Sequence, residues 1–192
     1  MKQSKIKEIV IPALSLFIIC IVVTALLGLT NAVTAPKIEE LAVETQEAAK
    51  KEVLADAASF GDAEQAQLNG TTYTYYKGLA ADSSVMGYVV ETVSKGYGGD
   101  ISLMVGVGVD GTVQGVSILS INETAGLGMN AENPEFLEQF LGKSGTIGVQ
   151  KNGSSDTEIQ ALTGATITSE AMADGVNQAL FVCEQLGGGV NG

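Results

Sequence analysis

The sequence predicts an α+β protein in which a single N-terminal transmembrane helix is followed by one extracytoplasmic α+β domain. Three observations predict this class: an uncharged apolar stretch near the start of the chain, several β-branched segments in its middle, and one amphipathic helix near its end. The part of this 192-residue chain that follows the apolar stretch is long enough to bury a core of its own.

The apolar stretch has the length of a membrane-spanning helix. No charged residue lies between Ile9 and Ala35. The most apolar part, Ile9–Leu29, would span roughly 30 Å as a helix, which is the thickness of a bilayer's hydrocarbon core. A cleaved signal peptide is the alternative, but its apolar part is usually shorter and ends at a clear small-x-small site. We therefore expect a transmembrane helix over residues 9–33.

Lysine placement predicts the orientation of this helix. Lys2, Lys5 and Lys7 precede it, whereas Lys37 is the only basic residue that closely follows it. Cytoplasmic flanks of membrane helices are enriched in lysine and arginine. We expect a single-pass protein of the cell (inner) membrane, with residues 1–8 in the cytoplasm and the C-terminal domain outside.

The composition excludes several classes of function. Past the apolar stretch the chain carries seven lysines and 21 acidic residues, which argues against binding nucleic acid or anionic lipid. The chain has no histidine, which excludes Ser-His-Asp catalysis and histidine ligands for a metal or haem. It has no arginine, so a phosphate would be held without a guanidinium clamp. Its two cysteines form no CxxC motif, and we expect no metal site.

The segments after the apolar stretch begin with a helical connector, expected over residues 34–60. Pro36 suits the first turn of a helix, which we expect to run to about Ala58 with only a thin apolar stripe. Gly61–Gly70 is polar and acidic and is expected to be a connection.

Strand-like segments occupy the middle of the chain. β-branched and aromatic residues predict strands over Thr71–Tyr76, Met86–Val93, Ile101–Val109 and Thr112–Leu119. Asp110-Gly111 between the last two predicts a hairpin with a type I′ turn, in which both central residues have positive φ.

Shorter elements lead to the final helix. We expect a loop over Ser120–Asn133 and a short helix over Pro134–Leu141. Two short strands are expected over Gly145–Val149 and Glu158–Leu162, and a last helix over Glu170–Leu186. The last helix has an apolar stripe, and Thr168 or Ser169 is expected to cap it.

Four glycine-containing or hydroxyl-rich motifs are candidates for a binding site. Gly106–Gly111 matches G-x-G-x-x-G, but it runs along a strand into a hairpin, whereas a dinucleotide site needs a helix there. Gly96–Gly99 could direct backbone N–H groups at a phosphate, or be a flexible loop. Glu123–Gly128 is another glycine-containing loop, and by itself it does not distinguish a binding site from an ordinary surface loop. Thr163–Ser169 places hydroxyls and a glycine before a helix N-terminus, which favours an anion, although an ordinary helix cap would use the same residues.

Leu162–Thr168 resembles the S/T-G-A-T-x-S/T signature of the FMN-binding domain family. This family includes the G subunits of Rnf complexes and the C subunits of sodium-pumping NADH:quinone reductases. Gly96–Gly99 and Glu123–Gly128 resemble two further family segments, in family order, so the resemblance covers the anchor and essentially all of the outer domain. The chain departs from the family pattern at Ala125, usually proline, and at Gln160, often an acidic residue that resembles part of a transferase recognition motif.

The resemblance implies a covalent FMN, joined to Thr166 by a phosphoester that a flavin transferase forms from FAD with Mg²⁺. It implies an FMN-binding domain over residues 61–192. It further implies that the phosphate pocket is shaped by Thr163, Gly164, Ala165 and Thr168, and that the ring or ribityl chain is lined by Gly98, Gly99, Glu123, Thr124 and Leu127.

The function that the resemblance implies is electron relay in an Rnf-type complex, an ion-translocating ferredoxin:NAD⁺ oxidoreductase. The chain would be an electron-transfer subunit without a complete active site of its own, and its partners would be other membrane and peripheral subunits and the flavin transferase. The short chain without large insertions favours an Rnf-type over an Nqr-type subunit. Two competing interpretations are a stand-alone membrane-anchored FMN-domain reductase and a non-catalytic anchored module in which Thr166 merely caps a helix.

Overall fold

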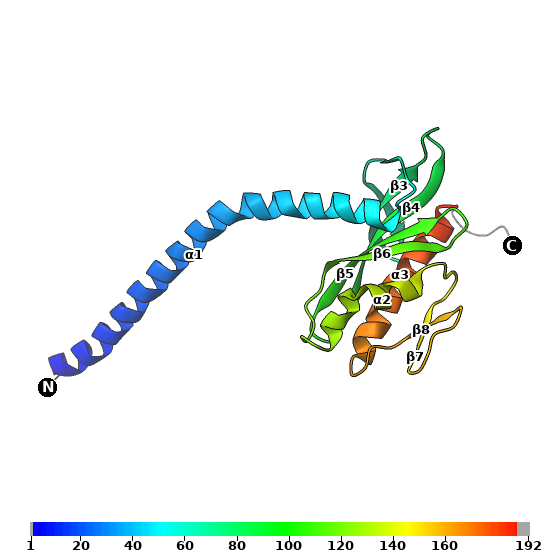
Figure 1. Ribbon diagram of the computed structural model, residues 1–192. Helices are drawn as coiled ribbons and strands as arrows, with labels where there is room; N and C mark the ends of the chain where they lie inside the picture. Colours follow the sequence, from blue (N-terminus) through cyan, green and yellow to red (C-terminus); the bar gives the residue numbers. More distant parts are fainter. Residues whose placement is uncertain (1, 188–192) are drawn as a thin grey trace. The chain divides into compact units, whose positions relative to one another are not determined.

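The computed structural model describes residues 2–187, with side chains from Ile9 onward (Figure 1). These residues form two units, one up to Glu44 and one from Thr45 onward. The second unit begins before the expected domain start at residue 61, because the last turns of the first helix pack on the sheet.

The first helix, α1 (Lys2–Val53), is continuous. From Ile9 it is long and apolar enough to cross a membrane, and none of the side chains in its most apolar stretch is buried in the protein. Pro36, expected in the first turn of the connector helix, lies in the interior of α1, as Pro12 does, and α1 ends at Val53 rather than at about Ala58. A proline removes one backbone hydrogen bond, and the alanine-, leucine- and glutamate-rich sequence around Pro36 tolerates that loss.

The second unit is built on an antiparallel sheet. Its strands are β1 (Ser59–Phe60), β2 (Glu64–Leu68), β3 (Thr71–Leu79), β4 (Val85–Lys95), β5 (Asp100–Gly108) and β6 (Val113–Ser120). The order across the sheet is β1-β3-β4-β5-β6, and β2 also pairs with β3. The four strands expected from the sequence are thus present and adjacent.

The connection expected over Gly61–Gly70 is instead an edge strand, β2, and a tight hairpin. Asn69 and Gly70 both have positive φ, 51° and 82°, as a two-residue type I′ turn requires. At Asp110-Gly111 the type I′ expectation is wrong, since only Gly111 has positive φ. There the Asp110 carboxylate accepts hydrogen bonds from the Thr112 N–H and hydroxyl and shapes a longer turn.

The remaining elements follow β6. They are η1 (Gly128–Glu132), α2 (Pro134–Leu137), η2 (Glu138–Phe140), the parallel pair β7 (Gly148–Gln150) and β8 (Glu158–Gln160), and α3 (Thr166–Gln185). The helix α3 starts four residues before the expected Glu170, so Thr168 and Ser169 lie inside it and do not cap it.

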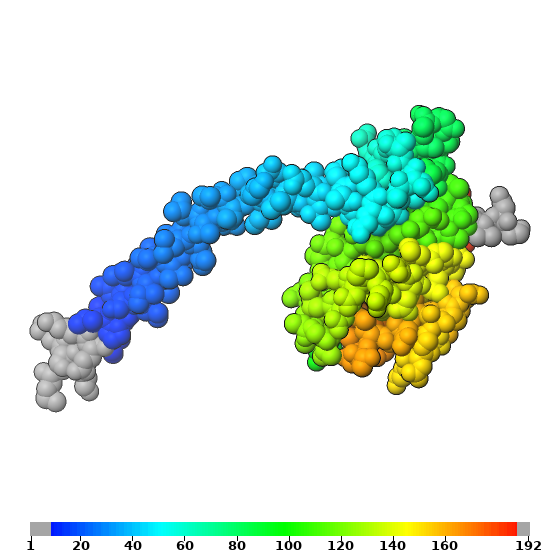
Figure 2. Space-filling model, viewed as in Figure 1, coloured from blue at the N-terminus to red at the C-terminus, as the bar shows by residue number. Residues whose placement is uncertain are grey.

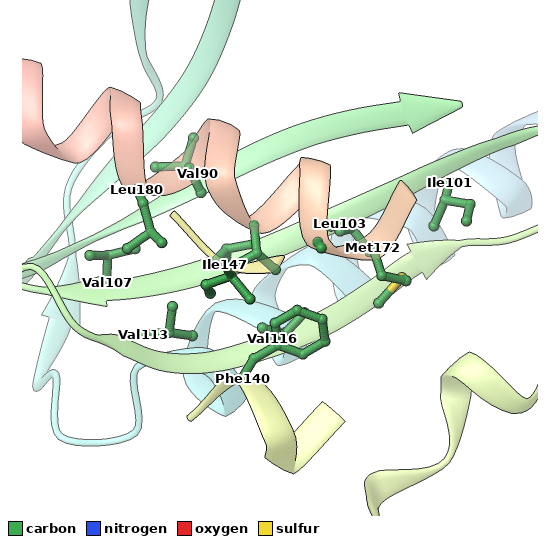
Figure 3. Packing of buried hydrophobic residues seen from close by; sticks show 14 of the residues in the cluster. Val90, Ile101, Leu103, Val107, Val113, Val116, Phe140, Ile147, Met172 and Leu180 are labelled. Atoms are coloured by element: carbon green, nitrogen blue, oxygen red, sulfur yellow. The ribbon is translucent and has the colours of Figure 1, made fainter. Parts of the chain in front are cut away.

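The main core lies between α3 and one face of the sheet. Figure 3 shows Met172 and Leu180 of α3 among the same group of side chains as Leu103 and Val107 of β5, and all four are buried. Phe140 of η2 closes the same core. The apolar stripe that the sequence placed on the last helix therefore faces the sheet.

The other face of the sheet receives the end of α1. Val53 is fully buried there, and a Cβ on Gly106 would lie 2.0 Å from its carbonyl oxygen. A Cβ on Gly115, the residue opposite Gly106 on β6, would lie 2.5 Å from the Val53 Cα. Gly106, the first glycine of the Gly106–Gly111 motif, thus leaves the space in which the end of α1 packs against the sheet. This packing role agrees with the rejection of a dinucleotide site.

Candidate functional site

Three loop segments that are distant in sequence meet around the start of α3. They enclose a pocket of about 450 Å³ lined by Tyr97, Glu123, Thr124, Leu127, Gly128 and residues 164–168. Figure 2 shows the start of α3, in orange, at the surface beside the yellow-green segment that follows β6. The volume lies within the range of ordinary ligand and cofactor sites.

The start of α3 leaves backbone donors free at this pocket. Ala165 is the N-cap residue and makes no side-chain capping bond. The Ser169 N–H donates to the Ala165 carbonyl at 3.0 Å. The preceding N–H groups, those of residues 166–168, have no carbonyl within the helix to which they could donate. Together with the helix dipole they form a site for an anion.

A buried serine fixes the turn before α3. The Ser169 hydroxyl donates to the Ala165 carbonyl at 3.0 Å and accepts the Leu162 N–H at 2.9 Å. Gly164 has a φ of 76°, which a side chain at that position would strain. These contacts hold the signature segment in one conformation and so set the position of Thr166.

Two threonine hydroxyls face the pocket differently. Thr166 is exposed at the first position of α3. Thr168 is only 1% exposed and lines the pocket. A threonine hydroxyl can donate and accept hydrogen bonds, so at this place it suits a polar ligand group.

Glu123 connects two of the loop segments. Its Oε1 accepts the Tyr97 N–H at 2.7 Å and its Oε2 accepts the Gly98 N–H at 3.2 Å. The backbone donors that Gly96–Gly99 was expected to offer a phosphate are therefore partly engaged by a carboxylate. Gly98 and Gly99 do not line the pocket, and a Cβ on Gly98 would lie 2.4 Å from the Asn122 carbonyl oxygen.

Exposed apolar side chains surround the pocket. Tyr97, Leu127 and Ile167 are 74%, 43% and 50% exposed, and all three line it. Grouped exposed apolar side chains mark a binding surface for an apolar or flat ligand. Sequence reasoning identified Leu127 but missed Tyr97, Gly128 and Ile167, although each lies inside one of the glycine-containing or hydroxyl-rich motifs.

Thr163 lies outside this pocket. It lines a separate hollow together with Gln160 and Gln139. The Gln160 N–H donates to the Gln139 side-chain oxygen at 2.7 Å, which ties the segment before the signature to η2.

A larger hollow, of about 570 Å³, lies where the end of α1 meets β1 and β3. It contains none of the motif segments. Its buried lysine, Lys50, is paired with Glu47 and lies 4.2 Å from the centre of the Tyr76 ring. Because this cation already has partners, the pocket at α3 is the better candidate site.

Comparison with known proteins decides the family. Residues 96–181 match the FMN-binding domain, and residues 1–53 match the RnfG N-terminal region. The G subunit of the Na⁺-translocating ferredoxin:NAD⁺ oxidoreductase complex of Acetobacterium woodii is 38% identical over 191 residues, which cover 90% of each chain. The chain belongs to the RnfG family.

Other RnfG relatives agree in length and coverage. The G subunit of the ion-translocating oxidoreductase complex of Methanosarcina acetivorans is 34% identical, with 96% of this chain and 100% of that protein covered. The G subunit of the proton-translocating ferredoxin:NAD⁺ oxidoreductase complex of Clostridium ljungdahlii is 37% identical, with 86% of each chain covered. All three pocket segments of this chain fall within the matched FMN-binding domain.

Solved structures support the fold of this RnfG chain. The crystal structure of NqrC from Shewanella oneidensis aligns with a TM-score of 0.53 at 19% identity, and covers 69% of this chain and 73% of that one. At this identity the likeness concerns the fold alone. Together with the long apolar helix α1 of this chain, it confirms the expected α+β architecture.

The residues of the pocket fit FMN. Free helix N–H groups and the Thr168 hydroxyl suit its phosphate, and the apolar side chains suit its ring. Within the part of the chain that the structure describes, no three acidic or cysteine side chains are grouped so that they could hold a metal ion.

Proposed function

We propose that this chain is the G subunit of an ion-translocating ferredoxin:NAD⁺ oxidoreductase complex and relays electrons through an FMN attached covalently to Thr166. When bound, FMN supplies the electron-carrying chemistry, and the protein positions it. The observation that carries the proposal is the exposed Thr166 hydroxyl at an uncapped helix N-terminus, inside a pocket that the family's three motif segments form.

The proposed attachment is a phosphoryl transfer to the Thr166 oxygen. A bond forms between Thr166 Oγ and the phosphorus on the riboflavin side of FAD, the pyrophosphate bond breaks, and AMP leaves. The hydroxyl proton passes to a base of the flavin transferase, whose Mg²⁺ neutralises the phosphates. This chain contributes the N–H groups at the start of α3, which stabilise the phosphate once it is in place.

The phosphate position defines how the rest of the FMN lies. With the phosphate at Thr166, the apolar side chains of Tyr97, Leu127 and Ile167, which line the same pocket, would hold the ring. The Thr168 hydroxyl would donate a hydrogen bond to the phosphate or ribityl chain. An FMN so tethered cannot diffuse away from a domain that we propose to lie outside the cytoplasmic membrane.

The partners are the other subunits of the complex, to and from which electrons pass, and the flavin transferase for maturation. The stretch Ile9–Ala35 of α1 contains no ionisable side chain other than Cys20, so we do not assign this helix an ion path.

In-gel flavin fluorescence tests the attachment. The chain is co-expressed with a flavin transferase and separated by denaturing electrophoresis, as wild type, Thr166→Val and Thr146→Val. Thr146 is an exposed threonine outside the pocket and controls for the substitution itself. We expect fluorescence in the wild type and in Thr146→Val and none in Thr166→Val. A fluorescent Thr166→Val band, or a dark wild-type band with the transferase active on a control protein, contradicts the proposal.

A further inference from the structure

We propose that Glu123 sets the reduction potential of the flavin by holding a fixed negative charge on the wall of the pocket. This inference rests on the proposed function, since it concerns FMN in that pocket. Glu123 is the only carboxylate among the lining residues, and none of them is a lysine. Its charge therefore has no opposite side-chain charge within the pocket wall.

The Glu123 carboxylate is held in place from several sides. The Tyr97 and Gly98 N–H groups donate to its two oxygens, one to each. A Cβ on Gly96 would lie 2.2 Å from Oε1, and a Cβ on Gly128 would lie 2.8 Å from Oε2. Backbone thus packs closely against both oxygens, and the carboxylate is confined to its position.

This charge lies beside Thr168 in the wall of the pocket. The same Cβ position on Gly128 lies 2.8 Å from the Thr168 hydroxyl oxygen, so Glu123 and Thr168 both pack against Gly128. Both side chains line the pocket, and Thr168 is only 1% exposed. A ligand that contacts the Thr168 hydroxyl therefore lies beside the Glu123 carboxylate.

The chemistry of a carboxylate gives the direction of the effect. An ionised carboxylate accepts hydrogen bonds and donates none, so it can pair with ribityl hydroxyls or a ring N–H but not with the ring carbonyl oxygens. An electron added to the ring brings negative charge, which a fixed carboxylate nearby disfavours. Near a protein surface, where the effective dielectric constant is about 20, one unit charge about 10 Å away changes such an equilibrium by about tenfold or more. Glu123 therefore lowers the reduction potential.

A purely mechanical role is the competing explanation. Glu123 could serve only to brace the loop at Tyr97, and its charge could be immaterial. Two substitutions separate these roles. Glu123→Gln removes the charge and keeps one acceptor oxygen, whereas Glu123→Asp keeps the charge and shortens the side chain, which weakens the brace.

The test is a redox titration of the flavinylated full-length chain, followed by flavin absorbance. Glu184→Gln is the matched control, because it removes the same charge from an exposed residue of α3 about 27 Å along the helix from Thr166. We expect Glu123→Gln to raise the one-electron potential by about 59 mV, which corresponds to tenfold in the equilibrium. We expect Glu123→Asp and Glu184→Gln to stay close to the wild type.

Three results overturn the inference. The first is a reduction potential of Glu123→Gln that is no higher than that of Glu184→Gln. The second is a shift in Glu123→Asp as large as the shift in Glu123→Gln. The third applies where Glu123→Gln retains no flavin, and is a reduction potential of Thr124→Lys equal to that of the wild type. The last variant adds a positive charge to the same wall, at a residue whose side chain takes no part in the hydrogen bonds of Glu123 to the Tyr97 and Gly98 N–H groups. A wild-type band without covalent flavin contradicts the proposed function instead, so the two failures are distinguishable.

Discussion

Substitution of Gly106 by alanine tests how the end of α1 is seated on the sheet. The new Cβ would lie 2.0 Å from the Val53 carbonyl oxygen and 2.6 Å from its carbonyl carbon, so backbone must move. If the last turn of α1 lifts away, Val53 and Leu54, now 1% and 4% exposed, lose burial worth about 1.5–3 kcal/mol each. If the strands shift instead, overpacking costs about 1–3 kcal/mol. The cheaper response prevails, and we expect the free energy of unfolding to fall by about 1–3 kcal/mol.

Urea denaturation followed by tyrosine fluorescence measures this effect. All five tyrosines lie between residues 73 and 97, so the signal reports on the second unit and not on the apolar stretch of α1. Gly61→Ala is the matched control, because its Cβ would meet only the Cβ and carbonyl oxygen of Lys77, both at an ordinary 3.8 Å. A Gly106→Ala variant within about 0.5 kcal/mol of Gly61→Ala, the range of neutral surface substitutions, would refute the reasoning.

Two further predictions concern topology and acid stability. Ser144→Cys, at an exposed position, should react with a membrane-impermeant maleimide added to intact cells. Wild type should stay unlabelled, because burial raises the pKa of the Cys183 thiol to about 12 and Cys20 lies in the apolar stretch. Labelling of Ser144→Cys only after cell lysis contradicts the outward orientation. Hydrogen bonds from Lys77 and Tyr75 hold the pKa of Glu64 below its ordinary 4.5, so this carboxylate stabilises the fold above pH 4.5, and the contribution disappears as the pH falls through its folded pKa. Thermal melts of Lys77→Met should accordingly show a slightly shallower loss of stability with acid than wild type, and identical acid profiles would contradict the ion pair.

Local patterns predicted the regular elements because most of them carry their own signal. The β-branched runs indicated β3 to β6, and the apolar stripe indicated most of α3. The strand β2 was missed because Glu64–Leu68 is largely polar, and its pairing with β3 rather than its own sequence makes it a strand. Asn69-Gly70 is a strong hairpin signal and could have revealed it.

The pocket was predictable in part for the same reason. Three motif segments could be identified from the sequence, but their contacts depend on tertiary structure. The hydrogen bond between Glu123 and the Tyr97 N–H joins residues 26 positions apart, and no local pattern encodes it. The place of Thr163 outside the pocket follows from the turn at Gly164, which directs the residues on its two sides to different surfaces.

Mass spectrometry of the mature chain tests the central claim most directly. Cleavage after glutamate releases the peptide Ile159–Glu170, which contains Thr163, Thr166 and Thr168 as its threonines. We predict that this peptide carries the mass of FMN less one water, and that fragmentation places the addition on Thr166. An unmodified peptide from a preparation made with an active flavin transferase, or an addition on either of the other two threonines, would contradict the account.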